Sequence, residues 1–146
     1  MWKSSSSERL MTDIAYIALG SNIGDRAGFL SRARAALAGL PKSRIVAESS
    51  IEETAAIGPV EQGPFLNQMV ALETSLSPAD LLRELQLIEQ REGRERTERW
   101  GPRTLDLDIV RFERQTVNVP SLTVPHPELE NRDFWQRELA ELGVKP

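Results

Sequence analysis

Apolar positions along the 146-residue chain switch between strand-like and helix-like spacing. Short apolar or alternating runs predict strands over residues 14–19, 44–51, 65–73 and 104–112. Apolar residues recurring every three or four positions predict helices over residues 29–40, 78–92 and 133–142. Breakers mark loops at 20–25 and 55–64, and residues 116–117 are expected to pair with the fourth strand as a hairpin arm.

The order strand, helix, strand, strand, helix, strand is that of a split βαβ unit. It predicts an α+β fold, a ferredoxin-like sandwich with a mainly antiparallel sheet and helices packed on it. Residues 14–146 are expected to form a single domain. Residues 1–13, which include a run of four Ser, are expected to be a disordered leader or a remnant of cloning. Because this fold also serves small RNA-binding domains, it does not define the function.

Composition narrows the function classes. Hydrophobic residues make up 40% and charged residues 27% of the chain, which is typical of a soluble globular protein. The net charge of −4 argues against binding to nucleic acid or an anionic membrane. The chain has no Cys, which excludes disulfides and Cys nucleophiles and suits a reducing cytoplasm. No apolar run approaches the length of a membrane span, and no signal peptide is visible.

The most informative segment, residues 99–109, reads RWGPRTLDLDI. In a strand Asp106 and Asp108 would share one face, with their Cα atoms roughly 7 Å apart. Carboxylates so placed could hold two Mg²⁺ ions, and nearby Arg side chains could bind the phosphates that accompany them. A solvated strand face is the alternative, and an Asp-x-Asp pair alone does not exclude it.

Five Arg residues interleave with three Glu between positions 91 and 103. They are either a solvated, self-paired helix end or a loop that grips phosphates, for which Arg is better suited than Lys. The chain contains no P-loop motif, so a nucleotide would have to be held by Arg side chains and metal ions.

Three further residues could serve either a core or a ligand. His126 is the only His and lies between two Pro, so it is either structural or a donor to phosphate. Phe65 and Asn67 are two apart on one predicted strand and therefore face the same way. They could belong to the core or could bind a flat, hydrogen-bonding ring.

With these residues in view, the chain resembles the 6-hydroxymethyl-7,8-dihydropterin pyrophosphokinases of folate biosynthesis over about residues 14–134. The most specific match is RWGPRTLDLDI. Four shorter matches support it: residues 18–25 (ALGSNIGD), 65–67 (FLN), Glu89 with 93–94, and 124–127 (VPHP).

The resemblance implies an enzyme that transfers diphosphate from ATP to the pterin hydroxymethyl group and releases AMP. It implies two Mg²⁺ ions on Asp106 and Asp108, and a catalytic set that adds Arg94, Arg96, Trp100 and Arg103. It implies ATP contacts from these three Arg residues and from Gln86, Glu89, Thr123, His126 and Arg132. It implies a pterin pocket of Thr54, Ile57, Phe65, Asn67 and Phe134. The expected protein is a cytoplasmic monomer whose partners are ATP and the pterin, with neither nucleic acid nor membrane.

The chain departs from the family pattern at Glu52, Ala56 and Ser121, and again in the tail that follows Phe134. Two other functions therefore stay open at this point. One is a non-catalytic ligand- or RNA-binding domain on the same fold. The other is a degenerate family member that binds nucleotide but not pterin.

Overall fold

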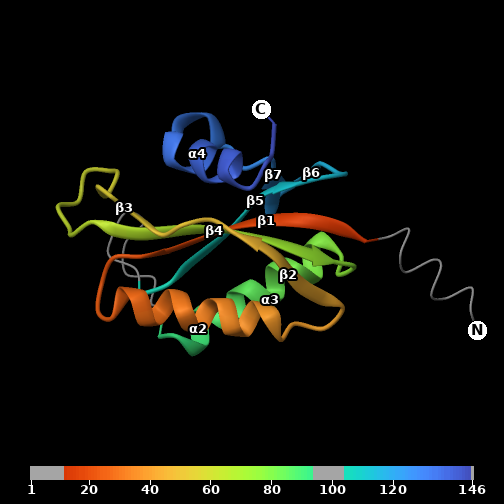
Figure 1. Cartoon of the computed structure of the whole chain (residues 1–146), viewed down its shortest axis with the longest axis horizontal. Coiled ribbons are helices and arrows are strands. Elements are labelled where there is room, and N and C mark those ends of the chain that lie inside the picture. Colours follow the sequence, from red (N-terminus) through yellow and green to blue (C-terminus); the bar gives the residue numbers. More distant parts are fainter. Residues whose placement is uncertain (1–11, 94–103, 146) are drawn as a thin grey trace, which may run out of the picture.

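Two helices cover one face of a central antiparallel sheet, and a third helix covers the other face (Figure 1). The computed structural model describes residues 12–93 and 104–145. The described elements follow one another as β1 (Asp13–Ser21), α2 (Arg26–Ala38), β2 (Ser43–Glu48), β3 (Glu52–Thr54), β4 (Phe65–Thr74), α3 (Pro78–Arg91), β5 (Asp106–Phe112), β6 (Val117–Val119), β7 (Leu122–Val124), a 3₁₀ turn (Leu129–Asn131) and α4 (Asp133–Glu141).

The main sheet has the order β2-β4-β1-β5, with β3 paired to the end of β4, and every described pairing is antiparallel. This order confirms the predicted ferredoxin-like α+β sandwich. The predicted limits of the second helix also agree with the structure, because the Ser77 side chain accepts a hydrogen bond from the Asp80 N–H and so caps the helix.

Side chains of alternating strand positions enter two separate cores. Ile17, Leu72 and Ile109 pack on the α2 and α3 side, whereas Ala18 and Met69 pack against α4 on the other side. The residues of α4 that face the sheet follow a helical stripe: Phe134, Trp135, Glu138 and Leu139. Among the described helices, none is long and apolar enough to span a bilayer.

Two sequence expectations about strands are wrong. The hairpin arm at 116–117 does not pair with β5, because β6 pairs with β7 around a two-residue turn at 120–121. The strand expected over 44–51 ends at Glu48 and is followed by the separate β3. Ser49 breaks the ladder, because its hydroxyl accepts a hydrogen bond from the Met69 N–H and its carbonyl accepts one from the Gln68 side chain.

Candidate active site

The floor of the main pocket is made by small residues in the middle of the sheet. Gly20 lies in register between Asn67 on β4 and Asp106 on β5, and Ala18 lies next to Asp108. A Cβ atom at position 20 would lie 3.4 Å from both the Asn67 Oδ1 and the Phe65 ring. The absence of a side chain there keeps the space between the amide and the carboxylates open.

Residues from four strands, from loops and from α4 surround this floor. The pocket is lined by Ala18, Leu19, Gly20, Thr54, Ala55, Ile57, Gln62, Phe65, Asn67, Asp106, Asp108, Arg132, Phe134 and Trp135. The lining includes every residue expected to hold pterin, together with both Asp residues expected to hold metal. The structure thus brings together side chains that are separated by up to about eighty positions in the sequence.

Asn67 supplies an oriented amide at the end of the pocket that Thr54 and Phe65 line. Its side chain is 6% exposed, and its Nδ2 donates to the Thr54 Oγ1 at 2.6 Å. This bond joins β4 to β3 and fixes which side of the amide carries the oxygen. An amide and a hydroxyl held beside the Phe65 ring can recognise the edge of a flat ring that carries donors and acceptors.

Asp106 and Asp108 lie on the α4 face of β5, as the alternation predicted. The intervening Leu107 and the flanking Leu105 and Ile109 are buried in the core on the opposite face. Since β5 is the edge strand, the Leu107 N–H points away from β1 and donates to the Glu89 Oε2 at 2.8 Å. Glu89, 4% exposed on α3, therefore fixes the backbone between the two Asp residues.

His126 lies beside this pair, with its Nε2 3.7 Å from the Asp108 Oδ1. The Glu128 N–H donates to its Nδ1 at 3.1 Å, so the proton of the neutral ring resides on Nε2 and faces Asp108. Burial lowers the pKa of His126, and the charge of Arg132 lowers it further, while Glu128 and Asp106 oppose the change. The ring is therefore a neutral donor near pH 7.

Not every expected nucleotide residue reaches the pocket. Gln86 and Thr123 are exposed and do not line it, and Glu89 is buried behind β5. His126 lies beside Asp108 but is not part of the lining either. The four catalytic residues expected in the Arg-rich segment, Arg94, Arg96, Trp100 and Arg103, lie outside the described residues. The structure thus places more of the residues expected to bind pterin at the pocket than of those expected to bind the nucleotide.

The Asp pair suits Mg²⁺ bound together with a nucleotide. Within residues 12–93 and 104–145, no three acidic, His or Cys side chains gather closely enough to form a metal cage. Mg²⁺ usually takes one or two protein carboxylates and completes its shell with phosphate oxygens and water. The two carboxylates at the pocket fit that donor set.

The chain matches the family model described as 7,8-dihydro-6-hydroxymethylpterin-pyrophosphokinase over residues 16–144. It belongs to the 7,8-dihydro-6-hydroxymethylpterin-pyrophosphokinase family. Similar relatives, each called 2-amino-4-hydroxy-6-hydroxymethyldihydropteridine pyrophosphokinase, come from Bacillus subtilis, Pseudomonas aeruginosa and Aquifex aeolicus. They are 48%, 44% and 37% identical to this chain; the alignments cover 90%, 91% and 87% of it, and 79%, 82% and 78% of the relatives.

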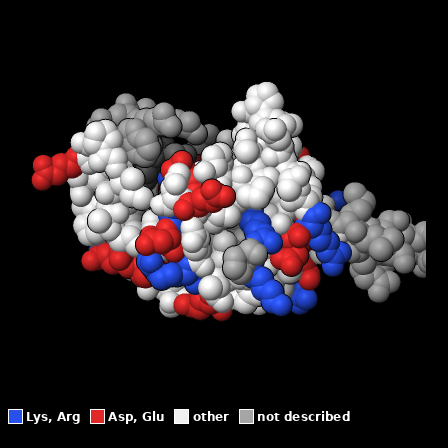
Figure 2. All heavy atoms as spheres, turned by 90° about the horizontal axis from the view of Figure 1, so that it is seen from above, with Lys and Arg blue, Asp and Glu red and all other residues white. Residues whose placement is uncertain are grey.

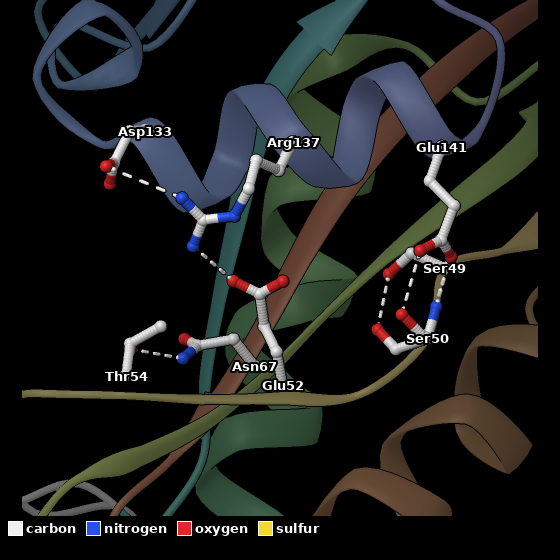
Figure 3. Close-up of polar contacts among 8 residues, drawn as sticks. All are labelled: Ser49, Ser50, Glu52, Thr54, Asn67, Asp133, Arg137 and Glu141. Atoms are coloured by element: carbon white, nitrogen blue, oxygen red, sulfur yellow. Dashed lines mark hydrogen bonds and ion pairs between the residues drawn. The ribbon is translucent and has the colours of Figure 1, made fainter.

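Within this pyrophosphokinase family member, ion pairs and hydrogen bonds connect α4 to the segment around β3. The Arg137 guanidinium on α4 lies 2.8 Å from the Glu52 carboxylate on β3 and 3.4 Å from Asp133 (Figure 3). One turn further along α4, Glu141 accepts hydrogen bonds from the Ser50 N–H and, at 2.8 Å, from its hydroxyl. These contacts attach α4 to the strand that carries Thr54.

Sequence reasoning missed two residues of the pocket lining that carry polar or aromatic side chains, Gln62 and Trp135. Gln62 accepts a hydrogen bond from the Asn22 Nδ2 at 2.6 Å, a contact between two loops that no periodicity could signal. Trp135 could have been found, because it directly follows Phe134 in the stripe of α4 that faces the sheet.

Acidic and basic side chains of the described residues intermingle over the face of the molecule that carries α4 (Figure 2).

Proposed function

We propose that this chain transfers a diphosphate group from ATP to the hydroxymethyl group of 6-hydroxymethyl-7,8-dihydropterin, with Asp106 and Asp108 holding two Mg²⁺ ions. The pterin binds between Phe65 and Phe134, and Asn67 binds its edge. One observation supports this most strongly: the aromatic residues, the oriented amide and the carboxylate pair line the same pocket.

Catalysis of this reaction depends on positioning the two substrates rather than on a covalent bond to the protein. The pterin hydroxyl oxygen forms a bond to the β-phosphorus of ATP, while the bond from that phosphorus to the oxygen leading to the α-phosphate breaks. AMP leaves with that oxygen, and the hydroxyl proton passes to water. Phosphoryl transfers of this kind depend on alignment and on neutralising the phosphate charge.

The residues of this chain have separate tasks in that step. Asn67, bonded to Thr54, fixes the rotation of the pterin between the two rings and so aims its hydroxymethyl group along the floor towards Asp106. The Nε2 proton of His126 and the Arg132 guanidinium face the phosphates. Bound Mg²⁺ would neutralise phosphate charge and lower the pKa of the attacking hydroxyl.

The proposal also covers the oligomeric state, the location and the binding partners of the enzyme. We expect the enzyme to act as a monomer in the cytoplasm and to bind no nucleic acid. The net charge of −4 and the mixed charges on the α4 face support the absence of nucleic-acid binding. Sedimentation of the chain with and without a short RNA would reveal both a dimer and an unexpected complex.

Phosphorus NMR tests the function directly. The protein is mixed with ATP, Mg²⁺ and 6-hydroxymethyl-7,8-dihydropterin, and the products are followed over time. AMP and a pterin diphosphate appearing in equal amounts support the proposal. ADP formation would indicate a different transfer, and no turnover despite ATP binding would favour a family member that has lost catalysis.

A further inference from the structure

Trp135 touches two residues of the nucleotide side at once. The Arg132 guanidinium carbon lies 4.4 Å from the centre of the Trp135 ring system, and the His126 ring meets the Trp135 ring edge-on, with centroids 5.0 Å apart and planes at 86°. Both partners come from the loop between β7 and α4, whereas Trp135 belongs to the helix itself. The indole is therefore a rigid support beneath a less regular segment.

Trp135 is poorly placed to bind a ligand itself. It is 2% exposed, and it packs with Phe134, Met69 and Val110 in the core beneath α4. The Arg132 guanidinium covers the indole, so little of the ring is left for a ligand to stack on. Its contribution to the site must pass through the residues that it holds.

The two supported residues have few other fixed contacts. In the described part of the chain, the buried Arg132 Nε has no hydrogen-bond partner. Among the described residues, the His126 Nδ1 accepts a hydrogen bond from the Glu128 N–H, and its Nε2 lies 3.7 Å from the Asp108 Oδ1. A guanidinium is attracted to the face of an indole, and this attraction favours one orientation of a side chain that otherwise has several.

We infer that Trp135 is a positioning residue, which orients Arg132 and His126 towards the phosphates beside Asp106 and Asp108. The inference rests on the proposed function for the identity of the ligand, ATP. The contacts of Trp135 with Arg132 and His126 are observed in the structure and do not depend on the proposed function.

The test compares Trp135→Leu and Trp135→Phe with Leu139→Ala. Leu139 is 5% exposed on the same helix and in the same core, so its truncation loosens α4 without removing either ring contact. ATP binding with Mg²⁺ is measured by calorimetry. We expect Trp135→Leu to weaken it about tenfold, Trp135→Phe to weaken it less because Phe retains a smaller cation–π contact, and Leu139→Ala to leave it within twofold.

A second measurement needs no ligand. Since His126 is the only His, its imidazole proton signals can be identified without ambiguity. At a pH where the ring is neutral, Trp135→Leu should shift these signals towards random-coil positions, and Leu139→Ala should not. In the wild type, nuclear Overhauser contacts between the His126 and Trp135 ring protons should be present, so the inference can be tested even if a variant fails to fold.

The outcomes separate the two proposals. A wild-type protein that shows the ring contacts but binds no ATP would refute the proposed function and leave the contacts intact. Equal loss of ATP affinity in Trp135→Leu and Leu139→Ala would overturn the inference, because Trp135 would then be only a core residue. Unchanged His126 signals in Trp135→Leu would overturn it as well.

Discussion

Replacing Glu138 with Gln should change how the stability of this protein depends on pH. Glu138 lies on the side of α4 that faces the sheet and is 2% exposed, and neither of its carboxylate oxygens has a hydrogen-bond partner in the described residues. Burial raises its pKa to about 8, the charges of Glu52 and Glu141 act in the same direction, and Arg137 opposes them. The folded protein therefore holds this side chain protonated near neutral pH.

The sign follows from the two states of the chain. In the unfolded chain Glu138 loses its proton near the ordinary value of 4.5, whereas in the folded protein it does so near 8. Its contribution to stability is thus complete below pH 4.5 and is lost as the pH rises towards 8. At 1.36 kcal/mol for each unit of pKa shift, the loss between pH 5 and pH 8 is about 3 kcal/mol.

Gln imitates the neutral carboxyl in size but cannot ionise. Urea unfolding of the wild type and of Glu138→Gln, followed by circular dichroism from pH 5 to pH 8, measures the difference. We expect similar stability at pH 5 and an advantage of about 3 kcal/mol for the variant at pH 8. Glu130→Gln, an exposed control, should follow the wild type. If the Glu138→Gln and wild-type curves run parallel over this range, the reasoning about burial is refuted.

Three other predictions concern the site. Asp106→Asn or Asp108→Asn should reduce turnover at least a hundredfold with an unchanged melting temperature; near-normal turnover in both would contradict their role with Mg²⁺. Phe65→Ala and Asn67→Ala should each raise the pterin KM about tenfold and spare ATP affinity, and steady-state kinetics with each substrate varied would expose the opposite pattern. Glu89→Ala should cost about 1–3 kcal/mol of stability, because the Leu107 N–H loses its acceptor. Glu89→Gln keeps an acceptor oxygen and should lose less; if urea unfolding shows the same loss for both variants, the hydrogen bond does not contribute as argued.

The periodicity of apolar residues predicts a strand correctly where burial in the core alone decides which way each side chain points. The strand around Asp106 and Asp108 was predictable because its Leu and Ile positions alternate with polar ones. The break after Glu48 was not, since it depends on a hydroxyl of Ser49 reaching β4. Local side-chain bonds of this kind compete with the sheet ladder and leave no periodic trace in the sequence.

The site could be predicted only in part for a related reason. Thr54, Phe65 and Asn67 were expected from the resemblance to the family, and the structure places them around one pocket. Trp135 belongs to the stripe of α4 that faces the sheet and could have been found from it, whereas Gln62 follows no motif and reaches the pocket from a loop, so its position depends on how distant segments pack. Packing of that kind is a tertiary property that spacing along the chain does not encode.

The two faces of the sheet depend on each other energetically. A slip of β5 by one residue would move Asp106 and Asp108 into the apolar core below the sheet and Leu107 into the pocket. Burying two carboxylates there would cost several kcal/mol each, which is comparable to the stability of a small domain. The apolar residues on the α2 and α3 side therefore fix the register that the pocket requires. Glu89 adds a second restraint at the edge strand, where no further strand could supply it.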